Sequence, residues 1–433
     1  MIYPGPLTRL QQERSQRNYN IFNVINGLSY MCLGETVLIL FAVQLECPDY
    51  VVSTLGAMTF FGFLLLPLGK IATAHFGAAR SQAVFWVARN LSALLVGSAT
   101  LLYCAGLSGA AVGVLLFGAF LFYGFRAAGV VMSQPLIGDI TTDLNRARVI
   151  AVSVGLFYIS CLAALLTISY LLSLNQSLWM LTAIIVAGSL LGCTSSRYLA
   201  RIDETEEIRA SARRPILPEL RDALKNPDLR RQLASGFSVN LGIIMMIPVS
   251  MLALKRGYAV SDTAALLFAV GQFGASAIMS FVAGKIAAAI GPRKTMLYAY
   301  AALLAIGLLW LVAPAQLHRG YMMIPFLLAG SSMVSLNNSV THYFLQVIPP
   351  KNRVAASIFI SVATGAGAGI AGMLLAGALL ELCARYSETP LGGYRLYFLA
   401  ALLLLLPGLR IIARLTPLPI EKRKIRKSWQ DAI

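Results

Sequence analysis

The sequence predicts an all-α polytopic membrane protein with twelve transmembrane helices in two pseudo-symmetric six-helix bundles. Three observations support this prediction: long apolar runs, an uneven distribution of basic residues between alternate loops, and a residue pattern that recurs in the second half. The chain has 433 residues, of which 58% are hydrophobic and 12% are charged. That composition is too apolar for a soluble domain of this size. A porin-like barrel is excluded because its strands alternate polar and apolar residues over short segments.

The apolar runs have the length of membrane-spanning helices. A helix needs about 20 apolar residues to cross about 30 Å of hydrocarbon. Residues 1–17 are polar and lead directly into the first run, so we expect the first helix to act as the insertion signal. The twelve predicted spans, in chain order, are 20–45, 50–69, 82–105, 110–136, 150–173, 177–195, 232–254, 263–284, 294–314, 321–346, 355–382 and 395–413.

The spans divide the chain into four parts. Residues 1–195 form an N-terminal six-helix bundle and residues 232–415 a C-terminal one. The polar stretch 196–231 is a linker. Its leucine spacing indicates a helix along the cytoplasmic surface, and the alternative is a solvated connection that only joins the two halves. Residues 416–433 form a basic cytoplasmic tail, which we expect to contact lipid headgroups.

Basic residues define the predicted orientation. Of 35 Lys and Arg residues, 27 lie in the N-terminus, the even-numbered loops and the C-tail, and 5 lie in the odd-numbered loops. By the positive-inside rule, this bias predicts that both termini lie on the cytoplasmic side of a cell (inner or plasma) membrane. The net charge of +17 is therefore explained by basic loops that face the anionic inner leaflet of the lipid bilayer. Nucleic acid is not expected as a partner.

The two halves repeat. A GKIA sequence begins at residue 69, after the second span, and again at residue 284, after the eighth. Each copy is followed by a second glycine and a basic end. Asn145-Arg146 and Asn352-Arg353 form another matched pair, each opening the next predicted helix. Two paired markers in register indicate a duplicated six-span unit.

Twelve spans, both ends inside, a long central loop and the glycine-basic loop between spans 2 and 3 resemble the major facilitator superfamily of transporters. The resemblance covers nearly the whole chain and implies a monomer with a central cavity lined by spans 1, 4, 7 and 10. It also implies a gating-loop motif that is matched here by Gly69, Gly77, Arg80, Gly284, Gly291, Arg293 and Lys294. The acid that in the family helps to latch the cytoplasmic side is replaced by Thr73 or Ala74, and in the second copy by Ala288.

Polar side chains lie on the spans that would line this cavity. In span 10 the candidates are spaced to share one helix face, and in span 1 they form a similar stripe. Serines in such positions also mediate helix packing. The candidate residues are Asn23, Asn26, Tyr30, Asn240, Ser331, Ser335, Asn338 and His342.

One acid and two bases lie in the membrane. Glu35 is the only carboxylate within an apolar segment, and it needs a partner, a water-filled cavity or a proton. Counting ~1.5 Å per residue puts Arg126 within reach of Glu35 and Arg89 farther away. Glu35 is then either half of a structural ion pair with Arg126 or a proton carrier. Arg89 either contacts an anionic or zwitterionic substrate or extends toward the interface.

These features predict a secondary transporter that moves a small solute by alternating access, coupled to protons or another ion. No Walker motif is present, the six cysteines are scattered, and no cofactor or metal is expected. Two alternatives remain: a membrane-bound transferase, disfavoured because only three histidines are present and lie far apart, and a scaffold with a transporter fold. The chain is therefore not expected to be an enzyme.

Overall fold

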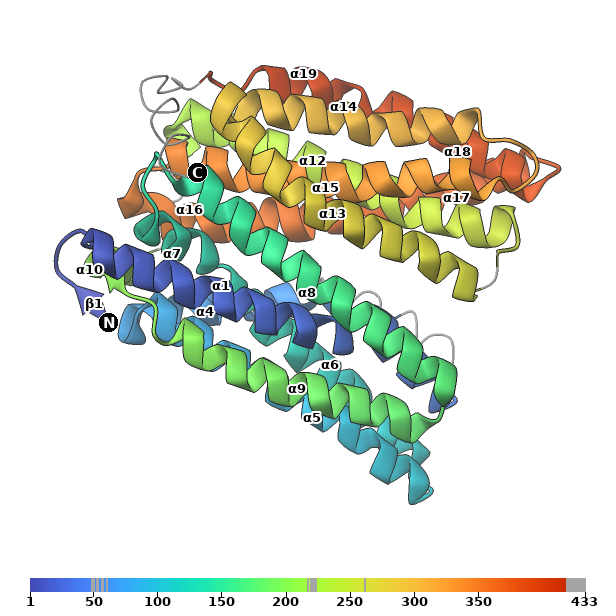
Figure 1. Ribbon diagram of the computed structural model, residues 1–433, viewed down its shortest axis with the longest axis horizontal. Helices are drawn as coiled ribbons and strands as arrows, with labels where there is room; N and C mark the ends of the chain where they lie inside the picture. The colour runs from blue at the N-terminus through green and yellow to red at the C-terminus, as the bar shows by residue number, and fades with distance from the viewer. Residues whose placement is uncertain are drawn as a thin grey trace, which may run out of the picture.

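Two helical bundles, one from each half of the chain, lie side by side in the computed structural model (Figure 1). The structure describes residues 1–47, 51, 54–55, 58–59, 61–215, 218, 224–260 and 262–417, without the side chains at 35, 36, 262–264, 266 and 351. Nearly all of the predicted basic tail lies outside the described residues, as do parts of the second predicted span and of the predicted linker helix.

The lower bundle in Figure 1 comes from the first half of the chain. A two-residue strand, β1, precedes it at Ile2–Tyr3. Its helices are α1 (Arg9–Cys32), α2 (Glu35–Gln44), η1 (Gly62–Leu65), α4 (Leu66–Phe76), α5 (Ala78–Cys104), α6 (Ser108–Val130), α7 (Ser133–Ile140), α8 (Arg146–Leu174) and α9 (Leu178–Leu199).

The upper bundle follows a linker that contains β2 (Glu204–Thr205) and α10 (Glu206–Arg213). β2 pairs in parallel with β1, with Ile2 opposite Glu204. The remaining helices are α12 (Pro227–Leu252), η2 (Ala253–Gly257), α13 (Asp262–Ile290), α14 (Pro292–Leu311), α15 (Arg319–Val347), η3 (Pro350–Asn352), α16 (Arg353–Ile360), η4 (Ser361–Gly367), α17 (Ala368–Arg385), α18 (Pro390–Leu405) and α19 (Pro407–Ala413).

The fold class is confirmed. Among the described residues, ten helices are long and apolar enough to cross a membrane, and Gly62–Phe76 is a shorter apolar helix. α15 has 29 residues, but polar residues near its middle, such as Asn337 and Asn338, keep it out of the apolar group. Together with Gly62–Phe76 and α15, these ten helices overlap all twelve predicted spans.

Local sequence explains where several helices begin. Thr8 and Gln11 form a capping box at the start of α1, in which each side chain bonds the other's backbone N–H. Ser177 caps α9 in the simpler way, by accepting from the N–H of Met180. Asn226 caps α12, which therefore begins within the predicted linker.

The bundles join at the end of the molecule that carries the N-terminus, called here the terminal end. A mixed hydrophobic cluster contains Ile137 and Ile150 from the lower bundle and Phe344 and Leu345 from the upper one. Small residues allow α13 to approach α8 closely: a Cβ on Gly284 would lie 2.3 Å from Cβ of Ala151. Packing of this kind is typical of membrane helices.

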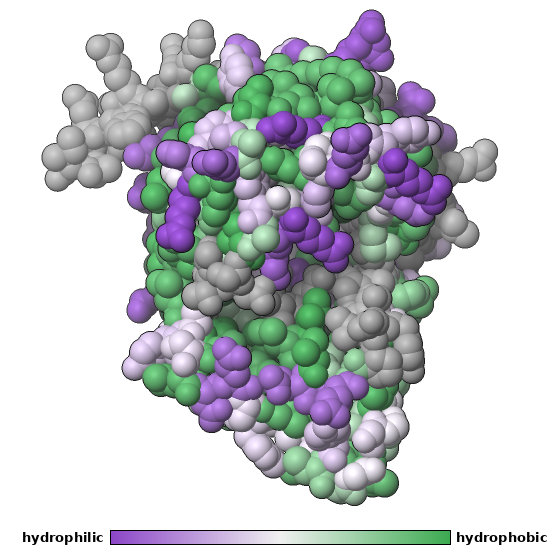
Figure 2. Space-filling model, turned by 90° about the vertical axis from the view of Figure 1, so that its right-hand side faces the viewer, coloured by the Kyte–Doolittle hydropathy of each residue, from purple (hydrophilic) through white to green (hydrophobic). Residues whose placement is uncertain are grey.

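The bundle axes diverge away from the terminal end (Figure 1). The Ser357 hydroxyl, on α16, donates to the Val131 carbonyl across the junction near the terminal end. Farther along, the rings of Tyr158 on α8 and Phe273 on α13 lie 6.0 Å apart. Figure 2 views the opposite end and shows the surface hollowed between the two bundles. The molecule is therefore tightly packed at the terminal end and hollowed at the far end.

Candidate functional site

A buried arginine lies at the centre of the lower bundle. Arg89, on α5, is 1% exposed, and its Nη1 donates to Oδ1 of Asn26 on α1 at 3.2 Å. Its guanidinium lies 5.2 Å from the ring centre of Trp86 and 4.8 Å from that of Phe122. Such faces attract a cation without neutralising it. Nε and Nη2 of Arg89 have no hydrogen-bond partner among the described residues.

A second arginine lies near the first. Arg126, on α6, is half-buried, and its guanidinium lies 5.3 Å from the ring centre of Tyr30. Its charge is close enough to act on that of Arg89. No described carboxylate forms an ion pair with either arginine. We call Asn26, Tyr30, Trp86, Arg89, Phe122 and Arg126 the arginine cluster.

Asn26 organises this cluster. Its side-chain oxygen accepts from Arg89 and also from Nε1 of Trp86, at 3.0 Å. Tyr30 lies one turn farther along α1, so one face of this helix meets both arginines. Four residues selected from the sequence (Asn26, Tyr30, Arg89, Arg126) are thus brought together. The aromatic residues Trp86 and Phe122 were not selected, because an aromatic residue in an apolar span has no distinguishing signal.

The first span is not one helix. The predicted span 20–45 lies within a candidate membrane span over Arg9–Gln44. Its helix is interrupted, because α1 ends at Cys32 and α2 begins at Glu35. Gly34, between them, has an extended conformation with φ −68° and ψ 163°. Broken helices within membrane segments occur where the backbone borders protein or a water-filled cavity. Glu35 is the first residue of α2, and its side chain, with the predicted Arg126 pair, lies outside the described residues.

The candidates on α15 lie in packed surroundings. Ser331 is half-buried, and Ser335, Asn338 and His342 are buried. Both ring nitrogens of His342 and Nδ2 of Asn338 have no hydrogen-bond partner among the described residues. The structure thus brings these residues together on one face, separate from the arginine cluster.

Asn337 is a polar residue that the sequence analysis missed. It is exposed, although it lies in the middle of α15. An exposed amide in a membrane span favours a water-filled cavity over lipid. The sequence does not indicate that Asn337 is the exposed one, because the neighbouring Asn338 is equally polar and fits the stripe on span 10. The other two candidates, Asn23 and Asn240, donate to the carbonyls of Tyr19 and Gly236, one turn earlier in their own helices.

The second glycines of the two glycine-basic loops have similar backbone conformations. Gly77 ends α4 with φ +85°, and Gly291 ends α13 with φ +84°. An L side chain rarely adopts this conformation, which accounts for both glycines. Gly69 and Gly284 allow close helix approach, because a Cβ on Gly69 would lie 2.1 Å from the Ala128 carbonyl oxygen.

The basic residues of these loops differ in their surroundings. Arg80 and Lys294 are exposed. Arg293 donates to the Ala413 carbonyl at 2.6 Å and so ties the start of α14 to the end of α19.

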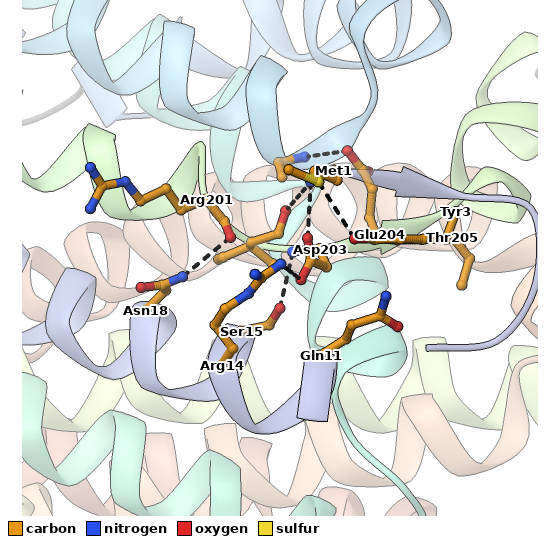
Figure 3. A network of polar contacts seen from close by, with 12 residues as sticks. Met1, Tyr3, Gln11, Arg14, Ser15, Asn18, Arg201, Asp203, Glu204 and Thr205 are labelled. Atoms are coloured by element: carbon orange, nitrogen blue, oxygen red, sulfur yellow. Dashed lines mark hydrogen bonds and ion pairs between the residues drawn. The ribbon is translucent and has the colours of Figure 1, made fainter. Parts of the chain in front are cut away.

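Acids from the linker occupy the terminal end of the lower bundle (Figure 3). Glu204 accepts from the backbone N–H groups of Ala78 and Ala79 at 2.6 and 3.3 Å, and so caps α5. Burial, and to a smaller extent the Asp139 carboxylate, raise the pKa of Glu204 to about 7, while the two backbone donors oppose this shift.

The neighbouring Asp203 binds the N-terminus. Its carboxylate contacts the Met1 ammonium group at 3.1 Å and Arg14 at 2.6 Å (Figure 3). These linker acids were not selected from the sequence, because nothing local indicates that residue 204 meets residue 78.

Comparison with solved structures relates the fold to known transporters. The proton:xylose symporter XylE is 13% identical, with a TM-score of 0.71, covering 93% of this chain and 96% of that one. A bacterial homologue of the iron transporter ferroportin is 12% identical, with a TM-score of 0.69 over 92% and 98%. The human organic anion transporter MFSD10 is 14% identical, with a TM-score of 0.67 over 93% and 99%. At these identities the similarity establishes the fold alone.

Sequence comparison identifies the family. No curated protein matches the chain. The family model of the Major Facilitator Superfamily matches residues 23–373, most of the chain. The helical two-bundle architecture agrees with that match. The chain is therefore an integral membrane protein that belongs to the major facilitator superfamily.

Proposed function

We propose that the protein is a secondary active transporter that moves a small anionic or zwitterionic solute across the membrane, coupled to protons, by alternating access. The observation that supports the substrate class is the arginine cluster, where two guanidinium groups form no ion pair with a carboxylate among the described residues. A buried cation without a counter-ion is costly. A substrate carboxylate or phosphate would bring a negative charge to this cluster and suits the planar donors of arginine.

The two arginines would have different roles. Arg126 is half-buried and can meet a solute directly, whereas Arg89 is fully enclosed behind aromatic rings. We therefore assign the direct contact to Arg126. Arg89 would add its field, which is strong at short distance in a medium of low dielectric constant.

Glu35 is our candidate for the coupling group. It stands in the first turn of α2, directly after the helix break at Gly34. A helix N-terminus favours a negative charge, so a change in the angle of α2 would alter the proton affinity of this carboxylate. Exchange of Glu35 between Arg126 and a proton would link protonation to movement of the bundles.

The experiment is uptake into proteoliposomes with an imposed pH gradient. Organic anions, amino acids, peptides, nucleosides and neutral sugars are first screened by the thermal shift they give the purified protein. We expect an anionic or zwitterionic compound to be taken up. Arg126→Gln should reduce that uptake at least about tenfold, as expected for loss of a charge-assisted contact. Arg197→Gln is the control, because Arg197 is exposed at the end of α9.

Other outcomes would assign another function. Turnover of a compound without a gradient would indicate a membrane-bound transferase. Binding without transport or turnover would indicate a scaffold. Uptake of neutral sugars alone, with Arg126→Gln unaffected, would contradict the proposed substrate class.

A further inference from the structure

A separate cavity lies at the terminal end, between α4 and the linker helix α10. Its volume is 510 Å³, about that of a small-molecule site. It is lined by Lys70, Ile71, Ala74, His75, Arg209, Ala212, Arg213 and Arg214. Five of these eight residues are Lys, Arg or His, and none is acidic. We call this the basic pocket.

Hydrogen bonds hold two of these arginines in place without neutralising them. Nε of Arg213 donates to the Ala74 carbonyl at 3.1 Å, and Nη2 of Arg209 donates to the His75 carbonyl at 3.0 Å. A carbonyl is neutral, so these two hydrogen bonds do not cancel the positive charges. Arg209 also forms an ion pair with Glu206 at 3.7 Å, which offsets part of its charge. Its Nε is buried and has no hydrogen-bond partner among the described residues.

Apolar side chains continue the surface from the pocket along α4. Ile71, which lines the pocket, is 57% exposed, and Phe76 is 61% exposed. Leu68, on the same helix, is 39% exposed. A basic cavity beside exposed apolar residues, at the end of a span, matches the boundary between lipid headgroups and acyl chains.

We propose that the basic pocket binds the phosphate of an anionic membrane lipid. The phosphate oxygens would accept from Arg209 and Arg213, and an acyl chain would lie along Ile71 and Phe76. Guanidinium groups suit this role because their planar donors match phosphate oxygens. The positive-inside prediction puts this end toward the anionic inner leaflet.

The position of α10 gives such a lipid a further effect. α10 packs on α4 of the lower bundle and also on η3 and α16 of the upper bundle (Figure 1). A ligand held between α4 and α10 would therefore strengthen the contact between the bundles at the terminal end. By mass action, it would favour the conformation in which this end is closed.

Native mass spectrometry of the purified full chain tests the site. The protein is taken from nanodiscs of phosphatidylcholine alone, or of phosphatidylcholine with phosphatidylglycerol, and retained lipids are identified. We expect the wild type to retain phosphatidylglycerol. R209Q/R213Q should bind it about 25-fold more weakly, at about fivefold for each arginine. R201Q is the control, because Arg201 is exposed at the same end and outside the pocket (Figure 3).

A second variant guards against misfolding. Ala74→Glu introduces a carboxylate beside Arg213. This carboxylate can pair with Arg213 and so compete with the lipid phosphate. It should lose phosphatidylglycerol and keep the elution volume of the wild type. Stabilisation of the wild type by inorganic phosphate alone, absent in both variants, would support the anion site and identify a soluble ligand. Equal lipid retention by the wild type, R209Q/R213Q and Ala74→Glu would overturn the proposal.

Discussion

Arg89 is the side chain whose burial costs the most free energy in the arginine cluster. Its charge is buried among aromatic rings, and two of its nitrogens have no described partner. Replacing such a group by an apolar side chain of similar volume is often neutral, or stabilising by about 1–4 kcal/mol. We therefore expect Arg89→Met to melt no lower than the wild type without substrate, and to lose the stabilisation that substrate gives.

Thermal melting with and without substrate measures both effects. Arg89→Lys is the matched comparison, since it keeps the charge but loses the planar donors. A melting temperature several degrees below that of the wild type would mean that Arg89 already has an acidic partner. That result would contradict the proposal that the charge of Arg89 attracts the substrate through its field.

The hypothesis that transport is coupled to protons depends on Glu35. Glu35→Gln keeps the shape of the side chain and removes its proton equilibrium. We expect accumulation driven by a pH gradient to be abolished, while exchange of labelled for unlabelled solute continues. Both are measured in proteoliposomes. Glu381→Gln is the control because Glu381 is exposed and pairs with Arg385 at the surface. Unchanged accumulation would reject Glu35 as the proton carrier.

At the residue scale, the sequence identified the charged residues within the membrane spans but not how they are arranged. An ionisable residue in an apolar run is conspicuous, so Arg89 and Arg126 could be selected directly. Their separate aromatic partners could not, because contacts between α1, α5 and α6 depend on helix rotation. Asn337 was missed for the same reason: which of two adjacent asparagines is exposed depends on packing.

At the element scale, the helices were predicted well and the interruptions were not. Long apolar runs allow one structure in lipid, since every backbone group must be bonded internally. The break before Glu35 has no comparable signal. The φ of Gly34 is open to any residue, so the glycine alone does not require it. The pairing of β1 with β2 joins residues about 200 positions apart, which no local pattern indicates.

The cap on α5 makes stability depend on pH. The folded pKa of Glu204 is about 7, against an ordinary value of 4.5. A raised acid pKa contributes stability that is complete below about 4.5 and is lost as the pH rises through about 7. The difference corresponds to at most about 3 kcal/mol. Glu204 faces the Asp139 carboxylate and the Met1 ammonium group, which shift this window in opposite directions.

Glu204→Gln should therefore melt with less dependence on pH between 4.5 and 8 than the wild type, whose melting temperature should fall over this range. Thermal melting of the purified protein at several pH values measures the difference. Glu207→Gln is the control because Glu207 is exposed in the same linker. Identical pH profiles for the wild type and Glu204→Gln would contradict the assignment of this dependence to Glu204.

At the scale of the whole molecule, the repeat in the sequence corresponds to a repeat in the structure. Gly77 and Gly291 have φ values within a degree of each other. Asn145 and Asn352 each precede the helix that Arg146 or Arg353 opens. The closed state of the terminal end was not predictable, because contacts between the bundles depend on a conformation that the sequence does not specify.

Gly284 offers a test of whether this closed end opens. A Cβ there would lie 2.3 Å from Cβ of Ala151 and 3.1 Å from the Ala147 carbonyl oxygen, both on the other bundle. Gly284→Val should therefore force the terminal ends apart, because backbone and small side chains cannot yield. If the protein has a second conformation open at this end, the substitution shifts the population toward it.

The measurement is the reactivity of a cysteine placed at Ser357, which is 1% exposed at the junction, in a chain lacking its six native cysteines. Gly284→Val should raise the rate of maleimide labelling at least about tenfold, equivalent to about 1.4 kcal/mol in favour of the open state. Gly377→Val is the matched control, since a Cβ at Gly377 meets nothing within 4 Å. Equal labelling in the two variants would mean that the junction absorbs the added side chain without opening, and alternating access would lose its structural basis at this end.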